Sequence, residues 1–286
     1  MNRVAWRIGV AFLVVSCATL HAQNAPPLET APPPRAVVVL SVTEVPKELR
    51  DRAKLDPFYK KCVDLEGLPI LSSEKVSDAA LLEAAFLIRK MLAERPDVLK
   101  EMAKRGVQFV VMAPTEMTTD VPEQRTMTPK DYWDARARGL GGRITSCGEE
   151  NLINLKGDRY PRENILIHEF SHAIHQYGLR GLDPKFDAKL KEVYKAAMDK
   201  ELWKDTYAVT NHSEYWAEGV QSYFDCNAPP NKGVHNDINT REKLAKYDPA
   251  LFELIDDTFK QNAWRYTRYD KRNQREVAPP PRPGKS

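Results

Sequence analysis

Residues 161–178 read PRENILIHEFSHAIHQYG, and this stretch predicts one helix. A proline suits the first turn of a helix, and a glycine suits the residue after its last turn. The apolar side chains between these two predict that the helix is buried, and they include Ile165, Leu166, Phe170, Ala173 and Ile174. The charged and imidazole groups on such a helix therefore need partners inside the protein.

His168 and His172 are four residues apart, so their imidazoles lie on one face of the helix, one turn apart. Two imidazoles at this spacing can bind a single zinc ion at about 2.0–2.1 Å. Glu169 lies about 100° round the helix from His168, where its carboxylate can reach a water molecule beside the ion without being a ligand. We therefore predict a Zn²⁺ site with His168 and His172 as ligands and Glu169 as the catalytic general base.

A catalytic zinc ion uses three protein ligands and keeps one position open, so a third ligand is needed. The motif His-Glu-x-x-His-x-x-Gly-x-x-His does not fit, because His175 stands at the glycine and Gly178 at the last histidine. The other common solution is a glutamate from a downstream helix. Glu214 and Glu218 lie one turn apart on one face, among aromatic residues. We predict Glu214 as the third ligand and Glu218 as a carboxylate that accepts the free N–H of a ligand histidine.

The residues alone leave alternatives to both glutamates. Asn211 and Glu214 are three residues apart, the spacing of a capping box at a helix N-terminus. Glu218 can equally face solvent. His175 is two turns from His168, too far to share its ion, and we expect a core or pocket-wall histidine.

Residues 207–218, YAVTNHSEYWAE, resemble the corresponding part of the catalytic domain of anthrax lethal factor, a gluzincin-type zinc metallopeptidase. The resemblance covers residues 164–178 and 207–224. It implies a zincin-like fold, a peptide or protein substrate, Glu214 as third zinc ligand and Glu218 as a carboxylate behind the site. It also implies that the Tyr207 phenol donates to the oxyanion formed during hydrolysis. Taken by itself, Tyr207 is equally consistent with a packed residue whose hydroxyl is satisfied.

The chain has 286 residues, of which 42% are hydrophobic, enough for one sizeable core. Its 43 basic and 40 acidic residues nearly balance, which disfavours a nucleic-acid partner. Strands are expected at residues 37–42, 107–112 and 152–155, and helices at 81–92, in both motif segments and after Pro129, Pro184 and Pro249. The predicted class is therefore α+β: a zincin-like metallopeptidase domain, mostly helical, with a small sheet in the N-terminal half.

Residues 1–22 have the layout of a secretory signal peptide: Arg3 and Arg7, an apolar run over residues 8–17, then small residues ending at Ala22. The apolar run is too short for a stable membrane span. Residues 14–17, VVSC, also resemble a lipoprotein signal, which leaves a lipid anchor at Cys17 open. We predict a secreted or periplasmic protein, with the membrane-anchored lipoprotein as the alternative.

After the signal peptide, residues 23–35 predict a proline-rich linker, residues 36–272 the catalytic domain, and residues 273–286 a disordered, basic, proline-rich tail. Three cysteines, Cys62, Cys147 and Cys226, remain in the exported chain, and their pairing is left open. Residues 143–155 precede the metal helix as the substrate-aligning edge strand does in zinc peptidases, although a buried hairpin fits equally well.

The leading hypothesis is hydrolysis of peptide bonds by metal-activated water. Two alternatives remain: a zinc hydrolase of a non-peptide amide, and a non-catalytic metal-binding cell-surface module. A structural zinc site fills all four positions with ligands and has no use for a base beside the ion. Glu169 therefore favours an enzyme over the module.

Overall fold

The computed structural model describes residues 40–231 and 233–272. The predicted signal peptide, linker and tail, together with Cys17, lie outside the described residues. Within the described part, no helix has the length and apolar character needed to cross a membrane.

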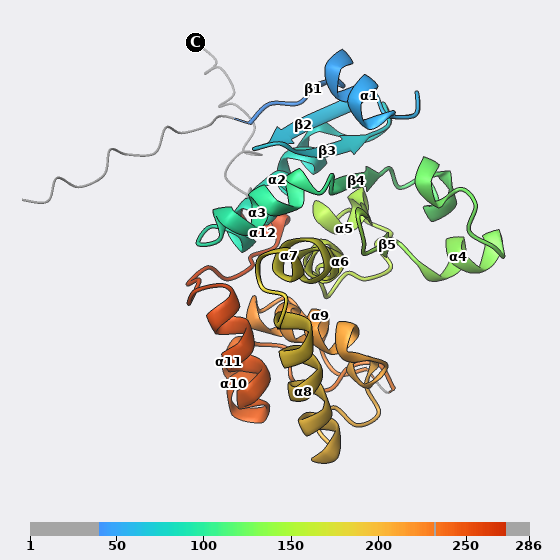
Figure 1. The fold of residues 1–286 in the computed structure, drawn as a ribbon. Helices are drawn as coiled ribbons and strands as arrows, with labels where there is room; N and C mark the ends of the chain where they lie inside the picture. Colours follow the sequence, from blue (N-terminus) through green and yellow to red (C-terminus); the bar gives the residue numbers. More distant parts are fainter. Residues whose placement is uncertain (1–39, 232, 273–286) are drawn as a thin grey trace, which may run out of the picture. The chain divides into compact units, whose positions relative to one another are not determined.

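A six-stranded mixed sheet occupies the N-terminal half, in the order β1-β2-β3-β4-β6-β5 (Figure 1). The central pairs β3–β4 and β4–β6 are parallel, and the three other pairs are antiparallel. The strands are β1 (Thr43–Glu44), β2 (Lys61–Leu65), β3 (Leu68–Ser72), β4 (Gln108–Met112), β5 (Gly139–Leu140) and β6 (Ile144–Gly148). Because every helix or strand that follows Gly148 in the described chain is a helix, apart from one isolated bridge, the predicted α+β class with a small N-terminal sheet is confirmed.

Alternate side chains of a strand point to opposite faces of the sheet, and on the central strands β3, β4 and β6 both sets are almost entirely buried. One face contributes Val63, Ile70, Phe109 and Val111 to the main core. The other face packs in a smaller cluster against α1 (Lys47–Ala53) and contributes Cys62, Leu71, Val110 and Met112.

Helices α2 (Asp78–Met91), α3 (Pro96–Lys104) and α6 (Ile165–Ala173) contribute to the main core on the sheet's first face. The predicted cap of α2 is present: the Ser77 hydroxyl accepts from the Ala80 N–H at 3.3 Å. The rings of Phe109 on β4 and Phe170 on α6 meet edge to face at 6.1 Å. Helix α6, which carries His168 and His172, is thus fixed to the centre of the sheet.

Helix α9 (His212–Tyr223) packs on α6, with α8 (Phe186–Asp199), α10 (Arg241–Tyr247) and α11 (Pro249–Thr258) around it (Figure 1). The Trp216 indole N–H donates to the Ser171 carbonyl at 3.0 Å, which joins α9 directly to α6. The remaining elements are short: α4 (Lys130–Arg136), α5 (Glu149–Leu152), α7 (Arg180–Leu182), α12 (Tyr269–Arg272), the 3₁₀ helices η1 (Thr118–Asp120), η2 (Pro122–Gln124) and η4 (Tyr207–Val209), and the π-helix η3 (Ile174–Leu179).

Several expected element boundaries were wrong. Helix α6 begins at Ile165 because the Asn164 side chain caps it, not at Pro161, and Gly178 lies inside the π-helix that continues it. Residues 149–152 form α5, so the strand expected at residues 152–155 is absent. The edge strand beside the metal helix is β5, because β6 is paired on both sides.

No disulfide joins the three cysteines of the described chain: Cys62, Cys147 and Cys226 are all buried free thiols. Burial raises the pKa of each thiol, so all three stay protonated at neutral pH. They act as small apolar core residues.

Asp248 connects the helices that hold α9 in place. Its Oδ2 accepts from the Trp203 indole at 2.9 Å and the Tyr215 hydroxyl at 2.6 Å, while its Oδ1 caps α11 through the Leu251 N–H at 3.1 Å. Asp248→Ala should therefore lower the free energy of unfolding by about 3 kcal/mol, because a cap is lost and buried donors are left unpaired. Urea unfolding measures this, with exposed Asp257→Ala as the control. Equal losses in both variants would contradict the assigned role.

Candidate metal centre

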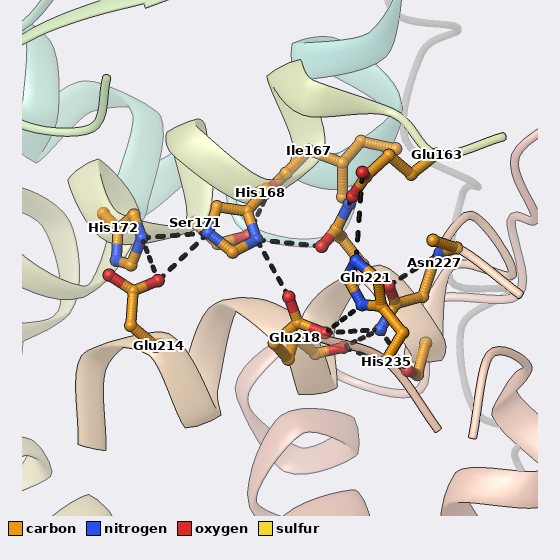
Figure 2. A network of polar contacts seen from close by, with 12 residues as sticks. Glu163, Ile167, His168, Ser171, His172, Glu214, Glu218, Gln221, Asn227 and His235 are labelled. Atoms are coloured by element: carbon orange, nitrogen blue, oxygen red, sulfur yellow. Dashed lines mark hydrogen bonds and ion pairs between the residues drawn. The ribbon is translucent and has the colours of Figure 1, made fainter. Parts of the chain in front are cut away.

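Helices α6 and α9 bring the three predicted ligands together. The Oε2 atom of Glu214 lies 3.1 Å from Nε2 of His168 and 3.3 Å from Nε2 of His172, and the two Nε2 atoms are 3.3 Å apart. All three side chains are largely buried. Figure 2 shows the two rings and the carboxylate turned toward one another.

The spacing of these atoms fits a tetrahedral ion. Four ligands at about 2.05 Å from zinc are separated from one another by about 3.3 Å. The three separations between the donor atoms of His168, His172 and Glu214 are 3.1, 3.3 and 3.3 Å. The structure therefore has three edges of one coordination tetrahedron.

The outer nitrogens of both rings have polar partners of their own. The Gln221 amide N–H group donates to Asn164 O at 3.2 Å, so its Oε1 is free to accept from Nδ1 of His168 at 2.8 Å. Nδ1 of His172 lies 2.9 Å from the Ser213 hydroxyl. A cation bound at both Nε2 atoms would leave the ring protons on Nδ1, where Gln221 and Ser213 can accept them.

The expected role of Glu218 is corrected in part. Its Oε1 lies 3.8 Å from Nδ1 of His168, beyond hydrogen-bond range, and Gln221 accepts that N–H instead. Glu218 is buried as predicted, not facing solvent, and its Oε2 binds Asn227 at 2.9 Å and His235 at 3.2 Å. It thus adds negative charge behind His168 without orienting the ring directly.

The structure supports the Asn211 cap of the capping-box alternative but not the part assigned to Glu214. The Asn211 side chain accepts from the Ser213 and Glu214 N–H groups at 2.8 and 3.0 Å, so it caps α9. The Glu214 carboxylate does not close a capping box with it but points at the two histidines. One segment therefore both starts the helix and orients the third donor.

The electrostatics of the centre favour a positive charge. Burial opposes protonation of His168, but hydrogen bonding to Glu214 and the charges of Glu169 and Glu218 outweigh it and raise the pKa of the ring to about 10. Burial also raises the pKa of the Glu214 carboxyl, yet its contacts with both histidines hold that pKa well below the usual range. These opposite shifts have one cause, a concentration of carboxylates around one point.

Glu169 lies beside the three donors in the wall of a cavity of about 480 Å³. Desolvation raises the pKa of its carboxyl, and the nearby histidines and the Gly141 N–H partly offset this. Strand β5 runs very close to α6 here: a β-carbon at Gly139 would lie 2.5 Å from Ile165 Cγ2, and one at Gly141 only 2.7 Å from His172 Cβ. Glycine is required for this approach.

Tyr207 also lines the cavity, with its ring centroid 6.3 Å from that of His168. Burial and the Glu214 charge raise the pKa of the phenol to about 12, so it is a hydrogen-bond donor at neutral pH. The Arg136 guanidinium, at the end of α4, partly offsets this rise in the pKa of the phenol. Sequence reasoning did not identify Arg136.

Sequence reasoning also missed three residues behind the ligands, although α9 carried a signal for one. Gln221 is seven residues after Glu214 and three after Glu218, so all three lie along one helix face. Glu163 and His235 had no such spacing. The structure places them within the network, since Gln221 Nε2 donates to Glu163 at 3.2 Å and His235 contacts Glu218 (Figure 2).

Comparisons with known proteins add little to this geometry. No family model matches the sequence, and no curated protein matches it. Among solved structures, that of the Pro-Pro endopeptidase PPEP-2 from Paenibacillus alvei is similar, with a TM-score of 0.46 and 18% identity over 68% of this chain and 97% of that chain. This likeness does not support the resemblance to anthrax lethal factor. The assignment of the site therefore rests on its own residues.

Glu214→Ala should lower zinc affinity by at least about 100-fold, because two imidazoles alone cannot complete the ligand set. Competition against a chromophoric chelator measures the dissociation constant. Glu253→Ala, on the exposed face of α11, is the control. Parent-like zinc binding by Glu214→Ala would show that the third ligand lies elsewhere.

Gln221→Met should weaken zinc binding by about 10–100-fold while keeping all three ligands, because the Nδ1 proton of His168 loses its acceptor. Gln221→Glu, which retains an acceptor, should bind zinc more tightly than Gln221→Met. Gln176→Met, in the wall of the same cavity, is the matched control. Identical affinities for Gln221→Met and the parent would remove Gln221 from the centre.

Proposed function

We propose that the chain is a zinc-dependent metallopeptidase of zincin-like fold that hydrolyses peptide bonds. The observation that supports this most is the convergence of His168, His172 and Glu214 on one point in the wall of a cavity, with Glu169 beside them. A zinc ion held there supplies a Lewis acid for a carbonyl group and acidifies a water molecule. Every other role belongs to side chains of this chain.

Glu169 is the proposed general base. Its position one residue after a ligand histidine, in the cavity wall, lets the carboxylate take a proton from the attacking water and pass it to the leaving amine. The Tyr207 phenol, protonated at neutral pH, is the proposed donor to the oxyanion. Arg136 lines the same cavity and interacts electrostatically with the phenol, so its positive charge would favour the oxyanion.

Strand β5 is the proposed substrate-binding edge. Among the described residues it pairs with β6 alone and is the last strand of the sheet order, which leaves its other edge for an extended peptide to pair with. Gly139 and Gly141 bring this edge against the helix that carries the base. A peptide backbone paired with β5 would therefore lie directly beside the proposed catalytic groups.

A catalytic centre accounts for this geometry better than a structural one. A structural zinc ion has four protein ligands, whereas three donors converge here and the fourth side faces a cavity. Hydrolysis of a non-peptide amide would use the same groups, but the free edge of β5 favours a substrate with a peptide backbone.

Export is also part of the proposal. The order of charged, apolar and small residues over residues 1–22 supports a cleaved signal and a secreted or periplasmic location. Acylation at Cys17 would instead keep the enzyme at a membrane. The mass of the mature N-terminus distinguishes these two outcomes.

Glu169→Gln should keep zinc affinity within about twofold of the parent and lower kcat by about 10²–10⁴-fold, because the metal ligands are intact and the base is lost. Turnover of a mixed protein substrate measures activity, and chelator titration measures zinc. Glu253→Gln should behave as the parent. Parent-like turnover by Glu169→Gln would refute the mechanism.

A further inference from the structure

A second group of two histidines and one carboxylate lies outside the residues that line the cavity. His175, Asp187 and His212 each offer one donor atom, and these atoms all lie within 4.8 Å of one another. They come from three elements: the π-helix η3, the first turn of α8 and the first residue of α9. π-Helices are rare and are frequently found at functional sites.

The contacts between the carboxylate and the two rings of this group parallel those of the first centre. Oδ1 of Asp187 lies 3.0 Å from Nε2 of His175 and 3.4 Å from Nε2 of His212, close to the edge of about 3.3 Å expected around tetrahedral zinc. The two rings are 5.9 Å apart at 80°, compared with 5.0 Å and 78° for His168 and His172. In both pairs the two imidazole rings are therefore nearly perpendicular to each other.

The group has a buried side, lined by aromatic rings, and a side that is open to solvent. His175 is only 2% exposed and packs on the rings of Phe186 and Trp216, at 5.7 and 6.5 Å. The side chains of Asp187 and His212 are 20% and 28% exposed, so an ion can enter from solvent. Buried rings hold one ligand rigidly while the open side leaves room for a water ligand.

One carboxylate oxygen of this group faces both rings. The Nδ1 atom of His175 is buried without a hydrogen-bond partner among the described residues, and its Nε2 atom contacts Asp187. Lys191 binds the other carboxylate oxygen at 2.8 Å and leaves Oδ1 facing both rings.

We infer that His175, Asp187 and His212 form a second site for a divalent cation of the zinc type, bound through two nitrogens and one oxygen. The site connects to the first centre through His212-Ser213-Glu214, because the Ser213 hydroxyl contacts Nδ1 of His172. A cation at this position ties η3, α8 and α9 together. It thereby stiffens the segments that carry His172 and Glu214.

Zinc stoichiometry tests this site separately from the catalytic one. The full chain is stripped with a chelator and dialysed against zinc chloride, and bound zinc is measured by native mass spectrometry. The parent should bind two ions, and His212→Gln and Glu214→Ala one each. If the parent and His212→Gln bind one ion and Glu214→Ala none, the second site is refuted while the proposed function stands.

A different set of stoichiometries would support the second site and contradict the ligand set of the proposed peptidase. If the parent binds one ion, Glu214→Ala one and His212→Gln none, the second site is supported and the ligand set of the proposed peptidase is wrong. These outcomes are read from metal content alone, so they do not depend on finding a substrate.

Lys191 supplies an independent test with a matched control. Lys191→Met removes a positive charge that competes with the ion, so zinc affinity at the second site should rise about tenfold. Lys195→Met, one turn further along α8, also removes an exposed lysine paired with an aspartate, but away from the site, and should leave affinity unchanged. Equal affinities for Lys191→Met and the parent, or equal gains in both variants, would overturn the inference.

Discussion

The whole arrangement depends on one electrostatic constraint: two imidazole nitrogens and a carboxylate oxygen face one another inside the protein. Without a metal ion, the carboxylates raise the pKa of His168 to about 10, so a proton on that ring supplies the positive charge beside Glu214. Contacts of the outer ring nitrogens with Gln221 and Ser213 hold both rings in this orientation. The fold therefore creates a requirement for positive charge that a divalent metal satisfies.

Contacts elsewhere in the fold hold these three donor atoms in position. Helix α6 is anchored to β4 through the contact between Phe109 and Phe170, and α9 is anchored to α6 through the Trp216 indole. Caps from Asn164 and Asn211 set the first turn of each helix and hence the direction of the donors that follow. Rigid support of this kind is what distinguishes a preformed metal centre from a chance meeting of ligands.

The parts of the site that depend on helical periodicity could be predicted from the sequence. The i, i+4 spacing of His168 and His172 predicted a shared face, and the need for a third ligand led to Glu214, which the structure brings to the same point. Longer-range contacts were not predictable. Glu218 was expected to accept the histidine N–H, but the register of α9 against α6 gives that contact to Gln221. The π-helix and the meeting of His175 with Asp187 depend on packing between helices, which spacing along one helix does not encode.

The most direct test is a crystal structure grown with zinc, with anomalous density measured at the zinc edge. We expect a peak bonded to Nε2 of His168, Nε2 of His172 and a carboxylate oxygen of Glu214, each at about 2.0–2.2 Å, with the fourth position open to the cavity. Absence of a peak between these atoms, or an ion held there by four protein ligands, would contradict the proposed peptidase centre.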